Sequence, residues 1–199
     1  MPATWFSSDT HFRHVLVAGL RGFATTEEHD ETVIAQWNKR VQPDDLVWHL
    51  GDVGLGGEEG ALEQAARLNG HKHLIAGNHD RCWPGRGNSR FRQRQWLEVF
   101  ESVQAFAAIR LDGRTVLLSH FPYLGAGDHT EEERGAQFRL HDEGLWLIHG
   151  HTHQPDQVDG LRSLHAGLDA WDLRPVNEGT ILARMREHET GLGRVIAVA

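Results

Sequence analysis

The residues of this chain that could do chemistry are histidines and acids gathered in short motifs. The chain has 15 histidines among 199 residues, and histidine is both the commonest metal ligand and an acid or base near neutral pH. Five motifs carry the candidates: Asp9-x-His11, Gly51-Asp52, Gly77-Asn78-His79-Asp80, Ser119-His120 and Gly150-His151-x-His153. In an extended segment residues i and i+2 project to the same side, so each Asp-x-His or His-x-His pair is expected to point both side chains into one site. These residue types at this spacing predict metal binding.

Each motif stands at or just after the end of a predicted strand. Short apolar or β-prone runs, typical of strands, occupy residues 5–8, 46–50, 73–76, 103–111, 114–119 and 145–148. The glycines before Asp52, Asn78 and His151 let the backbone turn tightly or approach another segment closely, as ligand loops at the rim of a sheet require. The candidate ligands are therefore expected at one edge of a sheet.

Helices are expected between these strands. Apolar residues recur at helical spacing in residues 25–41, 61–68, 91–100 and 176–187. Thr25 and Glu28 form a capping-box pattern at the start of the first helix. Asp112-Gly113 predicts a tight antiparallel hairpin, and residues 195–198 are interpreted as an edge strand. Strands alternating with helices, with some antiparallel pairing, predict one mixed α/β domain over residues 1–199.

The overall composition bears on location and partners. The formal charge of −8 opposes general attraction to nucleic acid or anionic membranes, although bound divalent cations would reverse the sign locally. Cys82 is the single cysteine, so an intramolecular disulfide is excluded and a cytoplasmic setting is favoured. No apolar run approaches the ~20 residues that span a bilayer, and the N-terminus lacks a signal-peptide pattern. A membrane partner is not expected.

Taken in order, the five motifs resemble those of the calcineurin-like metallophosphoesterases, especially the small stand-alone bacterial and phage-type members. The resemblance extends from Asp9 to His153, and five concordant motifs are far more specific than any one of them. It implies an α/β fold, a four-layer α/β/β/α sandwich of two mixed sheets flanked by helices. It also implies a site at the loop-bearing edge of the strands and a hydrolase that acts on phosphate esters.

The resemblance further implies two divalent metal ions that share one ligand. One ion would be bound by Asp9, His11, Asp52 and His153, and the other by Asp52, Asn78, His120 and His151. Two cations ~4 Å apart can make hydroxide from a shared water near neutral pH and can clamp phosphoryl oxygens during attack. Imidazole and carboxylate ligands are compatible with Mn or Fe, which we expect here, and also with Zn, Ni or Co.

Residues beside these ligands have expected roles in catalysis. By the same resemblance, His79 would be the general acid that protonates the leaving oxygen, and Asp80 would orient it. Arg13 and His14 directly follow the first motif, where they could reach a substrate phosphate; a solvated loop is the equally weighted alternative. His49 and His149 match no motif and are interpreted as surface or hydrogen-bonded polar residues instead of ligands, as are three others: His71, His73 and His188.

The expected function is hydrolysis of a phosphate ester by a metal-bound hydroxide. A phosphodiester, such as a nucleotide or nucleic acid, is slightly favoured over a phosphomonoester, because the short chain shows no cap domain to enclose a small substrate. Leu55-Gly56-Gly57 stands where the protein Ser/Thr phosphatases have Asp-Arg-Gly, so their arrangement is not expected. The rival hypothesis from another class is a non-catalytic metal-binding or protein-interaction scaffold on the same fold.

Overall fold

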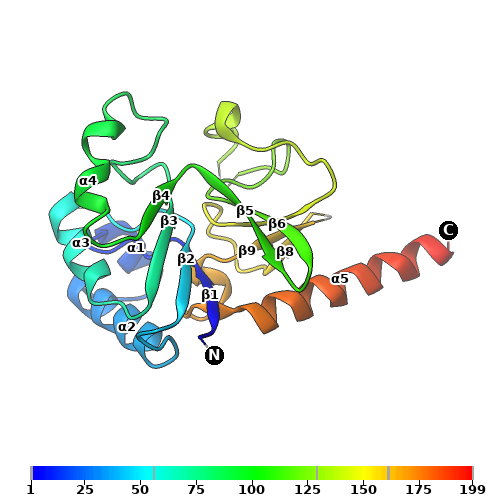
Figure 1. Ribbon diagram of the computed structural model, residues 1–199, viewed down its shortest axis with the longest axis horizontal. Coiled ribbons are helices and arrows are strands. Elements are labelled where there is room, and N and C mark those ends of the chain that lie inside the picture. The colour runs from blue at the N-terminus through cyan, green and yellow to red at the C-terminus, as the bar shows by residue number, and fades with distance from the viewer. Residues whose placement is uncertain (1, 56, 129, 161, 199) are drawn as a thin grey trace.

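The first of two sheets brings four strands of the chain into parallel register. The computed structural model describes residues 2–55, 57–128, 130–160 and 162–198 (Figure 1). The first sheet has the order β10-β1-β2-β3-β4. Its strands are β1 (Thr4–Ser7), β2 (Leu46–His49), β3 (His71–Ile75), β4 (Ser102–Gln104) and β10 (Val176–Asn177). β1 to β4 run parallel and β10 pairs antiparallel with β1, so the carboxyl ends of four strands share one edge.

The second sheet is also mixed, with the order β5-β6-β7-β9-β8. Its strands are β5 (Phe106–Leu111), β6 (Arg114–Ser119), β7 (Trp146–His149), β8 (Val158–Asp159) and β9 (Ser163–His165). β6, β7 and β9 are parallel, while β5 and β8 pair antiparallel with their neighbours. Asp112 and Gly113 have φ of 47° and 78°, so the hairpin predicted between β5 and β6 is confirmed.

Helices flank the sheets, as the predicted α/β architecture requires. α1 (Val15–Leu20), α2 (Thr26–Asn38), α3 (Glu58–Ala66) and α4 (Gln93–Trp96) lie on the side of the first sheet that faces away from the second (Figure 1). α5 (Glu178–Val198) begins directly after β10 and projects from the body of the molecule. α2 starts at the predicted cap, where Thr25 Oγ1 accepts a 3.1 Å hydrogen bond from Glu28 N. Two mixed sheets flanked by helices are thus confirmed.

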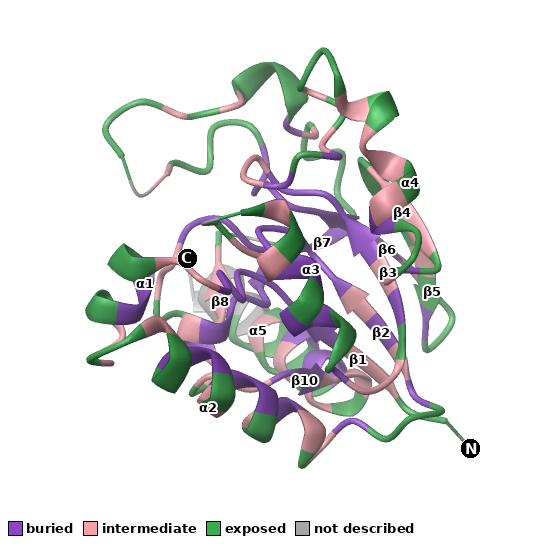
Figure 2. Cartoon of the chain, turned by 90° about the vertical axis from the view of Figure 1, so that its left-hand side faces the viewer, coloured by how far each residue is buried: buried purple, intermediate pink, exposed green. Residues whose placement is uncertain are grey.

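Two apolar clusters hold these layers together. One, with Trp37, Val47 and Leu74, packs helices against the first sheet, and the other, with Phe6 and Ile148, includes residues of both sheets. The first sheet therefore buries side chains on both of its faces, with Val47 and Leu74 in one cluster and Phe6 and Ile75 in the other. Figure 2 shows this as buried strands behind helices whose outer faces are exposed.

Two sequence predictions about secondary structure were wrong. Residues 91–100 form only the short α4 after a 3₁₀ turn at Ser89–Phe91, and residues 195–198 continue α5 instead of forming an edge strand. A short apolar run has no periodicity that separates a strand from the end of a helix, and β10 already occupies the edge beside β1. Within the described ranges, every helix is either too short or too polar to cross a bilayer.

Candidate metal centre

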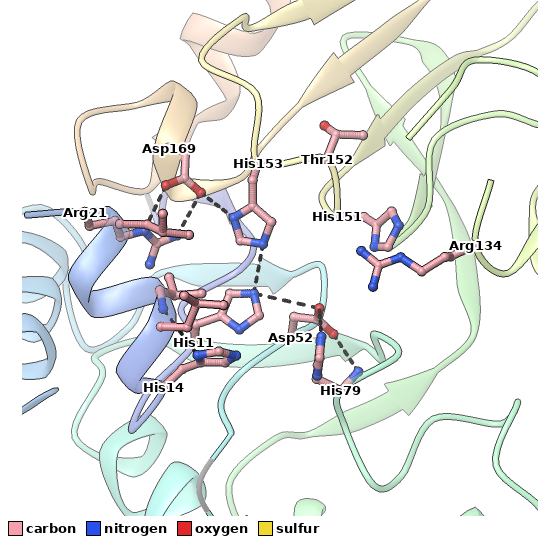
Figure 3. Close-up of a pocket in the computed structure, with 13 residues that line it drawn as sticks. His11, His14, Arg21, Asp52, His79, Arg134, His151, Thr152, His153 and Asp169 are labelled. Carbon is pink, nitrogen blue, oxygen red and sulfur yellow. Dashed lines mark hydrogen bonds and ion pairs between the residues drawn. The ribbon is translucent and has the colours of Figure 1, made fainter. Parts of the chain in front are cut away.

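The carboxyl ends of parallel strands from both sheets meet at one cavity. Loops after β1, β2 and β3 in the first sheet, and after β6 and β7 in the second, carry the five motifs. The cavity has a volume of about 560 Å³ (Figure 3). Side chains from four of the motifs line it: His11, Asp52, His79, His151 and His153. The fold thus brings together residues more than 140 positions apart in the chain, as between His11 and His153.

Asp9, His11 and His153 form the first of two potential ligand clusters. One ligand atom from each lies within 4.8 Å of the other two. His11 Nε2 and His153 Nε2 are 3.1 Å apart, and Asp9 Oδ1 is 3.8 Å from the former and 3.9 Å from the latter. Asp9 follows a strand of the first sheet and His153 follows a strand of the second, so this cluster takes ligands from both sheets.

Asp52, His120 and His151 form the second cluster, again with ligand atoms within 4.8 Å of one another. Asn78 adds a neutral oxygen, because its Oδ1 lies 3.1 Å from His120 Nε2. His120 Nδ1 is 2.7 Å from the Leu50 carbonyl oxygen, so it donates there and leaves Nε2 facing the cluster. This cluster also joins the sheets, since Asp52 follows β2 and both histidines follow strands of the second sheet.

Asp52 lies between the two clusters. Its Oδ2 is 3.8 Å from His11 Nε2 of the first cluster and 3.5 Å from His120 Nε2 of the second. Its Oδ1 accepts a 2.9 Å hydrogen bond from His79 N, which fixes the carboxylate in this orientation. This is the placement that a carboxylate shared by two cations requires.

A buried oxygen of Asp9 shows that cations fit this residue set. Asp9 is fully buried, and its Oδ1 has no hydrogen-bond partner in the described structure. An ionised oxygen buried without a donor is costly unless a cation compensates it. That oxygen faces two imidazole nitrogens, and oxygen with imidazole nitrogen is a ligand set suited to divalent transition metals.

Burial and neighbouring charges place most ligands in the form that binds cations. Burial favours the neutral form of Asp9, but the charges of His153 and His120 hold its pKa at about 2. Burial lowers the pKa of His11 well below its usual value and, with the charge of His120, lowers that of His151 to about 3. Ionised carboxylates and neutral imidazoles are the states that metal binding needs.

His120 and His153 differ from His11 and His151 in that their pKa values are raised; for His153, burial lowers the pKa, but a hydrogen bond to Asp169 and the charge of Asp9 outweigh it. Burial favours the neutral form of His120, yet the charge of Asp52 and a hydrogen bond to that residue raise its pKa to about 9. A cation that binds through His120 Nε2 must therefore displace a proton at neutral pH.

The backbone of the ligand loops is left-handed. Asp9 and His11 have φ of 58° and 48°, Asp52 has 54°, and His151 and His153 have 73° and 52°. The predicted extended geometry of the i, i+2 pairs was therefore wrong. A non-glycine residue pays a steric penalty in this region, and such strain concentrates at functional sites.

Glycines allow the loops to approach one another closely, as predicted. A Cβ on Gly77 would collide with Asp52 Oδ1, and one on Gly150 would collide with Ser8 Oγ and Asp9 Oδ2. Gly51, with φ of 94°, packs equally closely on the backbone of Gly77. Each of these positions excludes any side chain without displacement of a ligand loop.

Comparison with known proteins assigns the chain to a family. Residues 5–192 match the model of the calcineurin-like phosphoesterase superfamily domain. The chain belongs to the calcineurin-like phosphoesterase superfamily. It is 42% identical over 190 residues to the gene 66 protein of Mycobacterium phage D29, covering 89% of this chain and 94% of the phage protein.

More distant relatives of this phosphoesterase family member also align over most of their length. An uncharacterized protein of Methanocaldococcus jannaschii is 30% identical over 188 residues, with 89% of this chain and 88% of that protein aligned. Among solved structures, a protein of unknown function from Aquifex aeolicus superposes with a TM-score of 0.69 at 25% identity. The superposition covers 91% of this chain and 98% of the Aquifex chain, which supports a shared fold.

His79 lies at the cavity but outside both clusters. Its side chain is 31% exposed, and its Nε2 is 3.8 Å from Asp52 Oδ2. The centroid of its ring lies 5.5 Å from that of His11, and Figure 3 shows both side chains at the cavity. His79 is therefore accessible and close to the carboxylate of Asp52.

Asp80 does not contact His79 in the way that the sequence suggested. Its Oδ2 accepts hydrogen bonds from Asp52 N at 3.0 Å and Gly77 N at 2.8 Å, and its Oδ1 accepts one of 2.9 Å from Val53 N. Both oxygens are thus used by backbone donors of the loops after β2 and β3. Asp80 positions these two loops, and among the described residues no hydrogen bond joins its side chain to that of His79.

Arg13 and His14 lie in different surroundings. Arg13 is outside the cavity lining, with its Nε 3.6 Å from Asp30 and its Nη1 3.4 Å from Glu27. A contact with substrate would require it to leave both acids, so the geometry does not support that prediction. His14 does line the cavity, and its ring centroid lies 5.2 Å from that of His11. Substrate contact by His14 stays a prediction.

The sequence did not reveal two acids, Asp128 and Asp169, that contact the ligand histidines His151 and His153. His153 Nδ1 lies 2.8 Å from Asp169, which Arg21 binds through two hydrogen bonds of 2.8 Å. His151 Nε2 lies 3.0 Å from Asp128 Oδ2, and Arg139 donates to that same oxygen at 2.6 Å. Both arginines are buried or nearly so, with side chains 5% and 0% exposed. His151 and His153 are therefore each backed by a carboxylate that an arginine holds.

Two of the histidines that match no motif, His49 and His149, lie outside both ligand clusters. His49 is fully buried, with Nε2 3.0 Å from Thr10 Oγ1 and Nδ1 accepting from Gly51 N. His149 is fully buried, with Nε2 2.9 Å from Asp159 Oδ1. Their ring nitrogens are used within the protein.

Proposed function

We propose that this chain is a metal-dependent hydrolase of phosphate esters that binds two divalent cations, with a phosphodiester as the preferred substrate. The observation that carries the proposal is the position of Asp52, whose Oδ2 lies within 3.8 Å of a nitrogen ligand in each cluster. Asp9, His11 and His153 would hold one cation with Asp52. Asn78 and two histidines of the second cluster, His120 and His151, would hold the other.

The cations and the side chains would have separate tasks. When bound, two divalent cations lower the pKa of a shared water and neutralise phosphoryl oxygens. The ionised carboxylates of Asp9 and Asp52 keep the centre from accumulating positive charge. His79, on the accessible side of Asp52, would donate a proton to the leaving oxygen of the ester. Mn or Fe is the proposed metal, because mixed imidazole and carboxylate ligands suit both.

The charge of the substrate separates a diester from a monoester. A phosphodiester carries one negative charge, whereas a phosphomonoester carries up to two near neutral pH. Arg21 and Arg134 both line the cavity, and the guanidinium of Arg21 is bound to Asp169. The diester, with less charge to neutralise, is the substrate that we propose. A nucleotide or nucleic-acid diester is one such substrate, and the lone, buried Cys82 is consistent with the cytoplasmic setting that we propose.

The test is a metal-reconstitution assay on diesters and monoesters. The protein is stripped with chelator and restored with Mn²⁺, and hydrolysis of bis-p-nitrophenyl phosphate is compared with that of p-nitrophenyl phosphate. We expect activity that depends on manganese, with the diester turned over faster, and no activity in Asp52→Asn. Bound metal in the absence of turnover on either ester, across several metals, would contradict the proposal and favour the scaffold hypothesis.

A second substrate pair tests the role of His79. His79→Ala should lower kcat for diphenyl phosphate by roughly 10²-fold or more, but should lower kcat for bis-p-nitrophenyl phosphate much less. Phenolate is a poorer leaving group than nitrophenolate, so it depends more on the proton donor. His141→Ala is the matched control, because His141 is exposed and lies outside the cavity lining. An equal loss on both substrates would exclude the acid role.

A further inference from the structure

Helix α1 carries an exposed apolar surface beside the metal centre. Three of its six residues are large, apolar and exposed: Val15 at 78%, Leu16 at 66% and Leu20 at 78%. Single exposed leucines are common, but apolar side chains gathered at the edge of a cavity mark binding grooves. The helix begins at His14, whose Nδ1 accepts a hydrogen bond from Val17 N.

Part of this surface is a wall of the same cavity. Leu16, Val17 and Leu20 line it, together with the ligands His11 and His153. Val15 is as exposed as Leu20 but does not line it. The apolar wall and the metal ligands therefore face one continuous space.

His14 lies between the apolar residues of α1 and the side chains of His11 and His79. Its ring centroid lies 5.2 Å from that of His11 and 6.1 Å from that of His79. Because His14 is the N-cap of α1, the first turn of the helix is fixed next to the residues that would receive the phosphate. A phosphate placed at the clusters would lie in the same cavity as this wall.

The size of the cavity agrees with a substrate larger than a phosphate. Cavities of ~300–1,000 Å³ enclose whole small molecules, and this one measures about 560 Å³. Apolar walls with a few convergent polar groups are typical of sites that bind the organic part of a ligand.

We propose that Leu16, Val17 and Leu20 form a subsite for an apolar, aryl-like organic group of the phosphate ester. This inference rests on the proposed function, because the metal centre defines where the phosphate binds. It assigns specificity to α1: esters of apolar alcohols should bind more tightly than esters of small polar ones.

The test measures binding without turnover. Calorimetry on the Mn²⁺-loaded protein would compare phenylphosphonate with methylphosphonate, which share a phosphoryl group that cannot be hydrolysed. We expect phenylphosphonate to bind roughly tenfold more tightly, the range that a small apolar group gains in an apolar pocket. The ratio of the two affinities should fall toward one in Leu16→Ser and Leu20→Ser. Val15→Ser, with a similar exposure on the same helix, should keep the wild-type ratio.

The outcomes separate this inference from the proposed function. Equal affinities for both phosphonates, or the same ratio in Leu20→Ser as in Val15→Ser, would overturn the subsite. Preference for phenylphosphonate in a protein that hydrolyses no ester would support the subsite and overturn the hydrolase proposal alone. A dimer that dissociates in Leu16→Ser and Leu20→Ser, with the ratio unchanged, would make this surface an interface between copies and would also overturn the subsite. Because both leucines are exposed, these variants should fold normally.

Discussion

His153 is held from behind by Asp169, with Nδ1 and Oδ2 2.8 Å apart. Burial favours the neutral form of Asp169, but hydrogen bonds from Arg21 and His153 hold its pKa well below the usual range. An ionised acceptor at Nδ1 keeps the ring proton on that nitrogen. The lone pair of Nε2 is then directed at Asp9 and His11 before any cation arrives.

Asp169→Asn should weaken metal binding at the first cluster. Loss of such a carboxylate behind a ligand histidine typically costs about 10–100-fold in metal affinity, and Mn²⁺ titration of the stripped protein would measure it. Asp172→Asn is the control, because that side chain is 83% exposed and pairs with Arg174. Equal affinities in the two variants would show that Asp169 does not support the ligand.

Asp128→Asn should act on the other cluster. Asp128 Oδ2 lies 3.0 Å from His151 Nε2, so its loss should weaken the second metal-binding step by a similar factor. Asp142→Asn is the control, since Asp142 is exposed and accepts from Gly144 N in its own loop. If Asp128→Asn and Asp169→Asn weakened the same step of the titration, the two clusters would not be separate sites.

Gly77→Ala should disable the shared carboxylate. A methyl group there collides with Asp52 Oδ1 and N, and overpacking of this kind costs about 1–3 kcal/mol in stability. The carboxylate must move, so we expect loss of metal binding as well as a lower melting temperature. Gly87→Ala, where a Cβ meets no atom within 4 Å, should change neither property. Normal metal content in Gly77→Ala would contradict the packing argument.

Asp159 should make stability depend on acid pH. Burial favours its neutral form, but a hydrogen bond and a charge interaction with His149 hold its pKa at about 2. Its carboxylate therefore stabilises the fold above the unfolded-state pKa of ~4, and this contribution is lost as pH falls through about 2. In chelator-treated protein, urea unfolding should show Asp159→Asn destabilised at pH 7, with the deficit smaller by on the order of 1 kcal/mol at pH 3. A deficit that does not change with pH would contradict this.

The sequence reveals the candidate motifs because each motif is local, whereas the assignment of ligands to two cations is implied by the family resemblance and stays a prediction. Asp9 with His11, and His151 with His153, come together through adjacent positions at strand ends, and apolar runs reveal those strands. The same locality misled us about backbone shape, since spacing alone does not separate extended pairs from the left-handed pairs observed. Motif spacing can therefore identify candidate ligands without revealing the backbone conformation of the loops that carry them.

Residues that support the ligands could not be predicted in this way. Arg21 and Asp169 are 148 positions apart, and Asp169 and His153 are 16 apart, so no short pattern joins them. Such pairs depend on how α1 and the loop after β9 pack against the first sheet. The contact of Asp80 with the backbone was missed for a similar reason, because its partners Asp52 and Val53 lie 28 and 27 positions away.

Both clusters take ligands from both sheets, so metal binding should affect how much folded protein a cell contains. A ligand that binds the folded state alone lowers the unfolded fraction by mass action. If cations bind both clusters, as we propose, each cation would link the two sheets, and a cell deprived of divalent metal would hold more of this protein unfolded. Proteases act on the unfolded fraction, so the amount of this protein should follow the metal supply even when its synthesis is constant.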